Sequence, residues 1–177
     1  RMQAFLATKG KKLIGWDEIL EGDLGEGATV MSWRGTKGGI AASNRGFDVI
    51  MTPTTYCYFD YCQDPRRQES DEPICAFWGD LTFEKVYTFN PTEGLSKEAA
   101  SHILGAQANV WTEYIPTNEQ LEYMIMPRLF SLSEVQWSEM SNKDFNKFSE
   151  RVKSWGYDML RMKNFNFRNK PTQAQAE

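Results

Sequence analysis

The sequence is poor in the residues that bind metals and build disulfide frameworks. It has one histidine, His102, and three cysteines, Cys57, Cys62 and Cys75, an odd number without a CxxC pair. Zinc sites and disulfide scaffolds need more of these residues at regular spacing. We therefore expect no metal and no cofactor. We also expect three free, partly buried thiols, although Cys57 and Cys62 flank one short segment and could approach each other.

Long apolar runs and blocks of basic residues are also absent. No stretch approaches the roughly 18 apolar residues of a membrane span, and the start, RMQAFLATKGKK, lacks the apolar region and cleavage site of a signal peptide. A net charge of -4 without a Lys/Arg-rich block gives no electrostatic footprint for nucleic acid. No Gly-rich phosphate loop follows an apolar run, which argues against a nucleotide-binding sheet. We expect no membrane span and no nucleic-acid partner.

Four short apolar segments, bounded by Gly or Pro, predict strands at residues 12–19, 29–35, 47–53 and 103–111. A predicted helix, residues 37–46, separates the second strand from the third. The long section from residue 54 to residue 97 has no regular pattern, and a connection of that length is usually functional or carries small elements of its own. Alternating strands and helices with apolar strands are typical of a parallel sheet, either doubly wound or a (β/α) barrel.

The pattern beyond residue 117 is helical. Asn118 is the predicted cap of a helix that Pro127 should kink. Ser141 and Asp144 have the spacing of a capping box for a second helix. Apolar residues then recur at steps of three and four and predict a buried stripe rather than a cofactor site, formed by Phe145, Phe148, Val152, Trp155, Met159 and Met162.

Aromatic and acidic residues gather where the predicted strands end. In a barrel, the C-terminal ends of the strands build the active site. Trp111 and Glu113 are two positions apart, so in a regular strand they project from the same side. An aromatic plane beside a carboxylate suits a ring covered in hydroxyl groups, although a core tryptophan followed by a solvated loop gives the same letters. The other pairs are Trp16 with Asp17, Trp33 with Arg34, and Tyr58 with Asp60.

Five motifs, in order and at their spacing, carry a resemblance: GWDEI, VMSWRG, YFDY, GAQANVWTEY and EYMIMPRLFSLSEVQWS. The sequence resembles the C-terminal half of the catalytic barrel of glycoside hydrolase family 20, the β-N-acetylhexosaminidases. The resemblance implies an α/β fold, the C-terminal half (about strands 5 to 8) of a (β/α)8 TIM barrel followed by C-terminal helices. We expect residues 1–162 to form part of this catalytic domain and residues 163–177 to form a C-terminal tail.

The resemblance also implies a reaction. It is retaining, substrate-assisted hydrolysis, in which the acetamido oxygen of a terminal N-acetylglucosamine or N-acetylgalactosamine attacks the anomeric carbon. Tyr58 would orient that oxygen as a catalytic residue. The implied substrate-binding residues are the pocket-wall tryptophans and two acceptors for sugar hydroxyls, namely Trp16, Trp33, Trp111, Asp60 and Glu113.

One motif of the family is missing from the sequence. The catalytic acid and the carboxylate that orients the acetamido group form an Asp-Glu pair in a His-x-Gly-Gly-Asp-Glu signature, which does not occur here. Asp17 and Glu18 are also an Asp-Glu pair, but Trp16 precedes them where the signature has Gly. We expect them to support other residues of the site or to anchor a loop. A different retaining glycosidase, with Glu18 or Glu113 as its acid, is a further alternative.

These observations predict a hexosaminidase fragment that is inactive alone, whose partners are an N-acetylhexosamine-terminated glycan and the N-terminal half of the same barrel. Unpaired strand edges predict self-association. The alternative is a non-catalytic carbohydrate-binding or structural half-barrel. Glycan substrates place such parent enzymes in the periplasm, outside the cell or in lysosomes.

Overall fold

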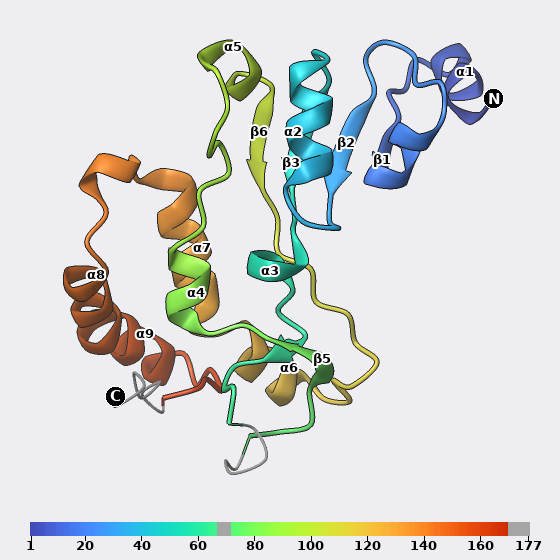
Figure 1. The fold of residues 1–177 in the computed structure, drawn as a ribbon. Helices are drawn as coiled ribbons and strands as arrows, with labels where there is room; N and C mark the ends of the chain where they lie inside the picture. The colour runs from blue at the N-terminus through green and yellow to red at the C-terminus, as the bar shows by residue number, and fades with distance from the viewer. Residues whose placement is uncertain (67–71, 170–177) are drawn as a thin grey trace. The chain divides into compact units, whose positions relative to one another are not determined.

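The computed structural model describes residues 1–66 and 72–169, and the chain forms two compact units. Unit 1 consists of Arg1–Cys57 and Asn90–Gln107, and unit 2 consists of Tyr58–Phe89 and Ala108–Glu177 (Figure 1). No helix in the described ranges is long and apolar enough to cross a membrane. Each unit combines two separate stretches of the sequence. The predicted boundary between a catalytic domain and a C-terminal tail at residue 162 stays a prediction.

Unit 1 is built on a parallel sheet with the strand order β1-β2-β3-β6. The strands are short, and β1 pairs with β2 from Ile14↔Thr29 to Trp16↔Met31. The prediction of four parallel strands alternating with helices is confirmed, although each strand is shorter than predicted. The elements of unit 1 are α1 (Met2–Thr8), β1 (Ile14–Trp16), the 3-10 helix η1 (Asp17–Glu21), β2 (Thr29–Ser32), α2 (Lys37–Asn44), β3 (Asp48–Met51), α3 (Thr54–Cys57), α5 (Lys97–Ala100) and β6 (Ile103–Ala106).

Helix α2 covers one face of this sheet, and Figure 1 shows it lying against β2 and β3. Gly39 allows the close approach, because a Cβ atom there would lie 2.7 Å from the sulfur of Met51. The Ser32 hydroxyl accepts a hydrogen bond from the Gly39 N–H at 2.8 Å and donates to the Gly35 carbonyl at 2.8 Å. Gly35 has φ +98°, which a side chain would strain. The end of β2 is thereby tied to the start of α2.

Unit 2 contains a pair of strands that the sequence did not predict. Tyr61–Cys62 forms β4 and Ala76–Asp80 forms β5, paired in parallel, and α4 (Phe83–Tyr87) follows. They lie in the section from residue 54 to residue 97 that lacks a regular apolar pattern. Gly79 packs against the ring of Tyr61, since a Cβ atom at this position would lie 2.3 Å from it.

The helices of unit 2 begin at different residues from those predicted. Thr117, rather than Asn118, caps α6 (Asn118–Ile125), because its side chain accepts from the Gln120 N–H. The helix does not bend at Pro127 but stops, and α7 (Arg128–Trp137) starts afterwards. A 3-10 turn, η2, spans Met140–Asn142. Asp144, rather than Ser141, caps α8 (Phe145–Arg151) through the Lys147 N–H.

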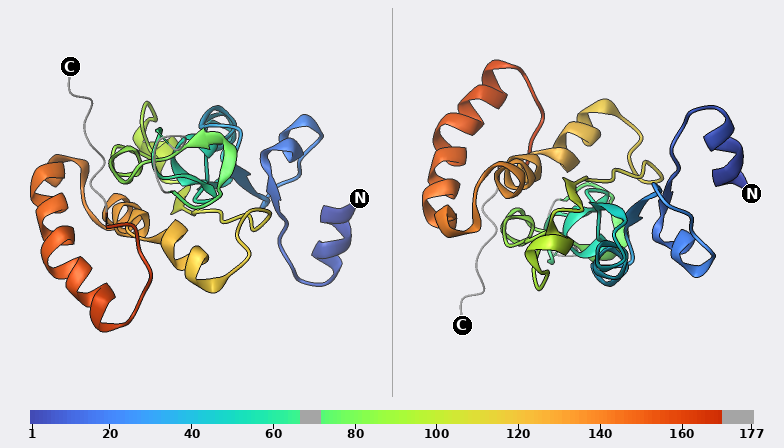
Figure 2. Two further views of the ribbon diagram at one scale, coloured as in Figure 1. Left: turned by 90° about the horizontal axis from the view of Figure 1, so that it is seen from below. Right: turned by 90° about the horizontal axis from the view of Figure 1, so that it is seen from above.

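The apolar stripe beyond Phe145 is only partly buried. Helices α8 and α9 (Tyr157–Met162) are joined by a π-helical turn, Val152–Gly156, and Figure 2 shows them as one continuous curved segment. The wider turn breaks the spacing of three and four residues, so Trp155 and Met162 are 69% and 77% exposed. Phe148 instead packs into an aromatic core, with its ring centroid 4.8 Å from that of Tyr87 and 5.3 Å from that of Phe83.

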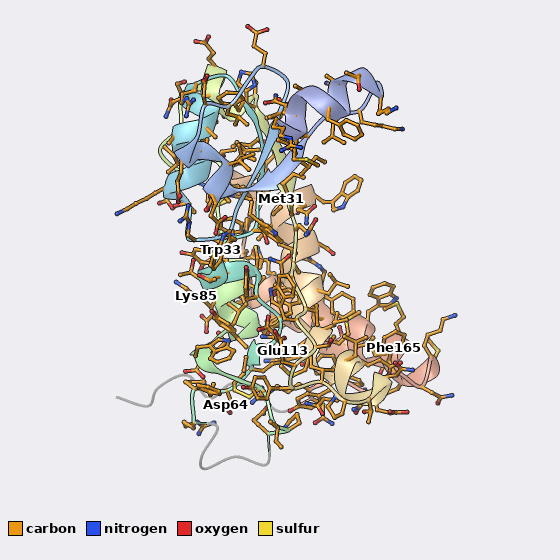
Figure 3. All side chains as sticks on the ribbon, turned by 90° about the vertical axis from the view of Figure 1, so that its right-hand side faces the viewer. Met31, Trp33, Asp64, Lys85, Glu113 and Phe165 are labelled. Atoms are coloured by element: carbon orange, nitrogen blue, oxygen red, sulfur yellow. A yellow bond between two sulfur atoms is a disulfide. The ribbon has the colours of Figure 1, made fainter. Side chains whose placement is uncertain are left out.

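The described part of the predicted tail is hydrogen-bonded to the rest of unit 2. Arg168 is buried and forms ion pairs with Asp64 at 2.8 Å and with Glu72 at 2.7 Å. The phenol of Tyr123 donates to the same Glu72 carboxylate. Residues 163–169 are therefore held against the segment that carries Asp64, which Figure 3 labels.

Candidate functional site

Two of the predicted site residues lie at the C-terminal ends of neighbouring strands in unit 1. Trp16 is the last residue of β1 and pairs in register with Met31 of β2. Trp33 follows β2 directly, as Figure 3 shows beside Met31. Because parallel strands end at the same edge of a sheet, both half-buried indoles belong to this edge. The structure thus places both residues at this edge of the sheet, and their role in sugar binding stays a prediction.

Asp17 anchors the loop that carries Trp33. Its Oδ2 atom accepts hydrogen bonds from the backbone N–H groups of Trp33 and Arg34, both at 3.1 Å. Its Oδ1 atom accepts from Nε of Arg34 at 2.6 Å, and the side chain is buried. A carboxylate whose two oxygens both receive hydrogen bonds from its own chain is poorly placed to protonate a leaving group. The predicted loop-anchoring contact of Asp17 is confirmed.

Glu18 contacts the indole of Trp33. Both carboxylate oxygens lie 3.0 Å from Nε1 of Trp33, which donates to them. This hydrogen bond lowers the pKa of Glu18 below its ordinary value of 4.5. A general acid that works near neutral pH needs a raised pKa. Glu18 is therefore suited to orienting Trp33 rather than to donating a proton.

Unit 2 brings together the other four predicted residues, beginning with the segment that carries Tyr58 and Asp60. Tyr58 forms an isolated parallel bridge with Asn109, and the Phe59 N–H donates to the Asn109 carbonyl at 2.8 Å. The Asp60 carbonyl accepts from the Ala76 N–H of β5 at 3.0 Å. The backbone of this segment is thus hydrogen-bonded on two sides, and both side chains are buried.

The Asp60 carboxylate is buried but only partly satisfied. Burial raises its pKa, and hydrogen bonds from the backbone of Asp60 itself and of Trp111 lower it. The positive charge of Arg128 also lowers the pKa, whereas the charge of Glu113 raises it. The other carboxylate oxygen, Oδ1, is buried and has no hydrogen-bond partner within residues 1–66 and 72–169. An unsatisfied buried acceptor costs about 1–3 kcal/mol, so a ligand hydroxyl would complete it.

The phenol of Tyr58 lies beside this carboxylate. Burial raises the pKa of Tyr58, while hydrogen bonds with the side chains of Trp111 and Asn109 lower it by less. The net rise keeps the hydroxyl protonated at neutral pH, where it can donate a hydrogen bond. Tyr58 and Asp60 both interact with Trp111, and Asp60 also feels Glu113, so these four residues form one group in unit 2.

The prediction that Trp111 and Glu113 project from the same side of a regular strand is wrong. Strand β6 ends at Ala106, and Glu113 lies in a turn after the ladder has ended, so strand alternation does not set the directions of these side chains. The last hydrogen bond along β3 runs from the Gln107 N–H to the Met51 carbonyl. Beyond it, the segment is placed by the bridge between Asn109 and Tyr58. Trp111 is 42% exposed, and Glu113 is also exposed.

An aromatic cluster that was not predicted from the sequence includes Tyr114, the residue after Glu113. Phe77 and Trp78 of β5 are 59% and 58% exposed, with ring centroids 4.3 Å apart. The ring of Tyr114 lies 6.0 Å from Phe77 and 5.8 Å from Trp78. In the sequence, the two adjacent aromatic residues directly before Gly79 could have indicated this cluster. The exposed rings of Phe77 and Trp78 offer flat apolar surface.

The prediction of three free thiols is wrong. Cys62 of β4 and Cys75, just before β5, form a disulfide with their Cα atoms 5.2 Å apart. The physical reason is the unpredicted pairing of β4 with β5, which brings residues separated by 13 positions together. Cys57 is free and buried, and burial raises its thiol pKa to about 12. The disulfide links β4, which follows Asp60, to the residue directly before β5, which carries Phe77 and Trp78.

Comparison with known proteins identifies relatives that cover most of the chain. The family model of the glycosyl hydrolase family 20 catalytic domain matches residues 1–140. A β-hexosaminidase from Porphyromonas gingivalis is 47% identical over 150 residues, covering 83% of this chain and 19% of the relative. A β-N-acetylhexosaminidase from Cellulomonas fimi is 30% identical over 147 residues, covering 81% of this chain and 29% of the relative.

Solved structures agree with this similarity. A β-N-acetylhexosaminidase from Streptomyces coelicolor has a TM-score of 0.84 at 25% identity, over 98% of this chain and 35% of that one. An exo β-N-acetylglucosaminidase from Vibrio harveyi, in complex with N-acetylglucosamine, has a TM-score of 0.83 at 27% identity, over 94% and 26%. The chain therefore spans between about a fifth and a third of the length of these relatives, and its fold is the predicted part of a TIM barrel.

Proposed function

The chain belongs to glycosyl hydrolase family 20, and from that membership we propose that it supplies the sugar pocket of a β-N-acetylhexosaminidase. The substrate would be a glycan ending in N-acetylglucosamine or N-acetylgalactosamine. The observation that carries the proposal is the buried, unpartnered Oδ1 atom of Asp60, in the group that contains Tyr58, Trp111 and Glu113. An aromatic plane, a phenol and two carboxylates match the chemistry of a hydroxyl-rich ring.

Asp60 and Glu113 would accept hydrogen bonds from sugar hydroxyls. Hydrogen bonds to charged groups contribute roughly 1.5–3 kcal/mol each, and the value is highest where water is excluded. Asp60 is buried and meets this condition, whereas Glu113 is exposed in the chain. Trp111, which is 42% exposed, would stack on the apolar face of the pyranose.

Tyr58 would act on the reacting group. In substrate-assisted hydrolysis, the acetamido oxygen forms a bond to the anomeric carbon as the bond to the leaving oxygen breaks, and water later reopens the ring intermediate. A protonated phenol would hold that oxygen in an attacking position and share its changing charge. Trp16 and Trp33 would wall the acetamido group. That all six residues face one pocket stays a prediction.

The proton donor would come from residues outside these 177. Asp17 is bonded to its own chain, and the pKa of Glu18 is lowered rather than raised. The proposal therefore assigns the acid and the acetamido-orienting carboxylate to the Asp-Glu signature that this sequence lacks. It also places the whole enzyme in the periplasm, outside the cell or in a lysosome.

The exposed cluster of Phe77, Trp78 and Tyr114 would contact the next sugar of the glycan. Stacked aromatic side chains offer flat area at low entropic cost, which suits a second pyranose ring. The alternative is a non-catalytic carbohydrate-binding or structural module. In that case the same pocket would bind sugar in the complete gene product without turnover.

The test is a turnover assay with a chromogenic aryl N-acetylglucosaminide on the complete gene product and on the 177-residue chain. We expect the complete product to be active. Asp60→Asn should lower kcat/KM about 10- to 100-fold, because that factor corresponds to the loss of one hydrogen bond to a charged group. The chain alone should show no turnover above background, because a positioned general acid contributes about 100- to 10,000-fold.

Asp64→Asn is the matched control, because Asp64 is buried in the same unit but paired with Arg168. It should alter stability more than KM. Sugar binding without turnover in the complete product would favour the non-catalytic alternative, and the absence of both would overturn the proposal. Turnover by the isolated chain that Glu18→Gln abolishes would show that the acid lies in this chain.

A further inference from the structure

Arg128, the first residue of α7, is fully buried and donates only to backbone carbonyls within the described residues. Its Nη2 atom lies 2.5 Å from the Phe59 carbonyl oxygen, and its Nη1 atom lies 2.9 Å from that of Tyr61 and 3.0 Å from that of Leu81. Nε and Nη2 both donate to the Met124 carbonyl. A buried guanidinium that lacks a hydrogen-bonded carboxylate is costly, so its retention needs a reason.

The position of two of these carbonyls supplies that reason, because Phe59 and Tyr61 are the neighbours of Asp60. Phe59 and Asp60 lie in a turn, which a hydrogen bond from the Tyr61 N–H to the Tyr58 carbonyl closes at 3.2 Å. The carbonyls of Phe59 and Tyr61 both accept from Arg128, and the carbonyl of Asp60 accepts from Ala76 of β5. The backbone at Asp60 is therefore held from both sides.

The charge of Arg128 also acts on the Asp60 carboxylate. Burial and the charge of Glu113 raise the pKa of Asp60, whereas Arg128 lowers it. The phenols of Tyr58 and Tyr61 are the other titratable groups that face this carboxylate. Burial raises the pKa of each phenol, and the charge of Asp60 raises it further. Within the described residues, Arg128 is the cation that acts on Asp60, and Asp60 and Glu72 in turn raise the pKa that burial lowers in Arg128.

We propose that Arg128 is a positioning residue for sugar recognition, which fixes the direction of the Asp60 side chain through the two flanking carbonyls and faces its carboxylate with a positive charge. The assignment of a sugar as the ligand rests on the proposed function. The placement of the Asp60 side chain and the effect of the Arg128 charge do not rest on the proposed function, because both concern Asp60 in the chain without a ligand. Arg128 acts through Asp60 and touches no reacting atom.

The first measurement is the titration of the Asp60 carboxyl group by carboxyl-carbon NMR in the 177-residue chain, assigned with Asp60→Asn. Arg128→Lys and Arg128→Gln both lose the planar fork, but only Lys keeps the charge. We expect the Asp60 midpoint to rise by about one pH unit in Arg128→Gln and to stay near the wild-type value in Arg128→Lys. An unchanged midpoint in Arg128→Gln would overturn the electrostatic part.

Arg168→Gln is the matched control. Arg168 is also a buried arginine of unit 2, but it pairs with Asp64 and Glu72 rather than with the carbonyls beside Asp60. We expect Arg168→Gln to lower thermal stability without moving the Asp60 midpoint. Equal midpoint shifts in the two Gln variants would show a general effect of losing a buried cation and would overturn the proposal.

The geometric part has its own measurement, which also decides the matter if Arg128→Gln does not fold. Lys cannot reach both flanking carbonyls, so Arg128→Lys should speed amide hydrogen exchange at Ala76 at least about 10-fold, whereas Arg168→Lys should not. Equal exchange in the two Lys variants would overturn the proposal. If the Asp60 midpoint and the exchange respond as expected but the complete gene product binds no sugar, the proposed function fails and the positioning of Asp60 stands.

Discussion

The Oδ2 atom of Asp17 lies 3.1 Å from the backbone nitrogen of Trp33 and accepts its hydrogen bond. This contact joins the end of β1 to the first residue after β2, sixteen positions further along the chain. A predicted wall of the sugar pocket is therefore placed by a carboxylate of η1, the 3-10 helix that follows β1. The short distance makes Asp17 a structural residue with an indirect effect on the pocket.

Replacing Asp17 tests this contact. We expect Asp17→Ala to lower the free energy of unfolding by about 1–3 kcal/mol, because two backbone donors of the Trp33 loop lose their acceptor. Asp17→Asn keeps one oxygen and should cost less. Denaturant unfolding of the chain measures both. Glu21→Gln is the control, since Glu21 contacts Arg34 on the exposed surface. A loss for Glu21→Gln equal to that for Asp17→Ala would contradict the anchoring role.

The contact between Glu18 and Trp33 should respond to acid. The pKa of Glu18 is depressed in the folded chain by the hydrogen bond from Trp33, so the contribution of this bond is present above the ordinary value of 4.5 and is lost as pH falls through the folded pKa. Tryptophan fluorescence should therefore show a transition below pH 4.5. Glu18→Gln should remove it, and Glu21→Gln should not. A transition that persists in Glu18→Gln would disprove the assignment.

Tyr58→Phe should affect the chemical step of the complete gene product more than substrate binding. We expect kcat to fall about 100-fold and KM to change by less than about threefold, since the phenol bond strengthens in the transition state. Tyr61→Phe is the control, because its ring lies 5.7 Å from that of Tyr58 and belongs to the same segment. Burial raises the pKa of Tyr58, so the alkaline limb of the wild-type rate should not reflect Tyr58 below pH 10. An unchanged kcat would contradict the role.

Breaking the disulfide should weaken unit 2. The bond between Cys62 and Cys75 closes a loop of 13 positions, for which chain entropy predicts about 3 kcal/mol. We expect Cys62→Ser with Cys75→Ser to lower the free energy of unfolding by about that amount. Intact-mass measurement of the oxidised wild type should show a gain of two hydrogens on reduction. Two labelled thiols at positions 62 and 75 in the oxidised, denatured chain would show that the bond is absent.

The sheet and the helices could be predicted because their signals are local. Val30, Val49 and Ala42 are fully buried, and the predicted segments that contain them enclose β2, β3 and α2 and extend beyond these elements by one to three residues. The predicted pocket residues come from the five motifs that carry the resemblance to the family, and their role in binding sugar stays a prediction. Their placement at strand ends followed from the boundaries of β1 and β2, which lie within three residues of those predicted.

The errors arose where a distant partner decides the local structure. Strand β5 contains Phe77 and Trp78, which are adjacent and both exposed, so its sequence has no alternation of buried and exposed residues to reveal it. Its pairing with β4 defines it. The disulfide depends on that pairing and was missed for the same reason. Thr117 and Asn118 are both good caps, and sequence preference cannot choose between neighbours. The position of Arg128 could not be predicted from the sequence, because its hydrogen-bond partners are backbone carbonyls, which every residue possesses.

The interleaving of the two units has a consequence for how the chain is made and inherited. The chain passes between the units after Cys57, after Phe89 and after Gln107. During synthesis, β3 cannot pair with β6 until β4, β5 and α4 have left the ribosome. Unit 1 therefore cannot complete its sheet before part of unit 2 has been synthesised. Recombination at a single crossover would likewise divide at least one unit. The two units are therefore not exchangeable as contiguous segments of the chain.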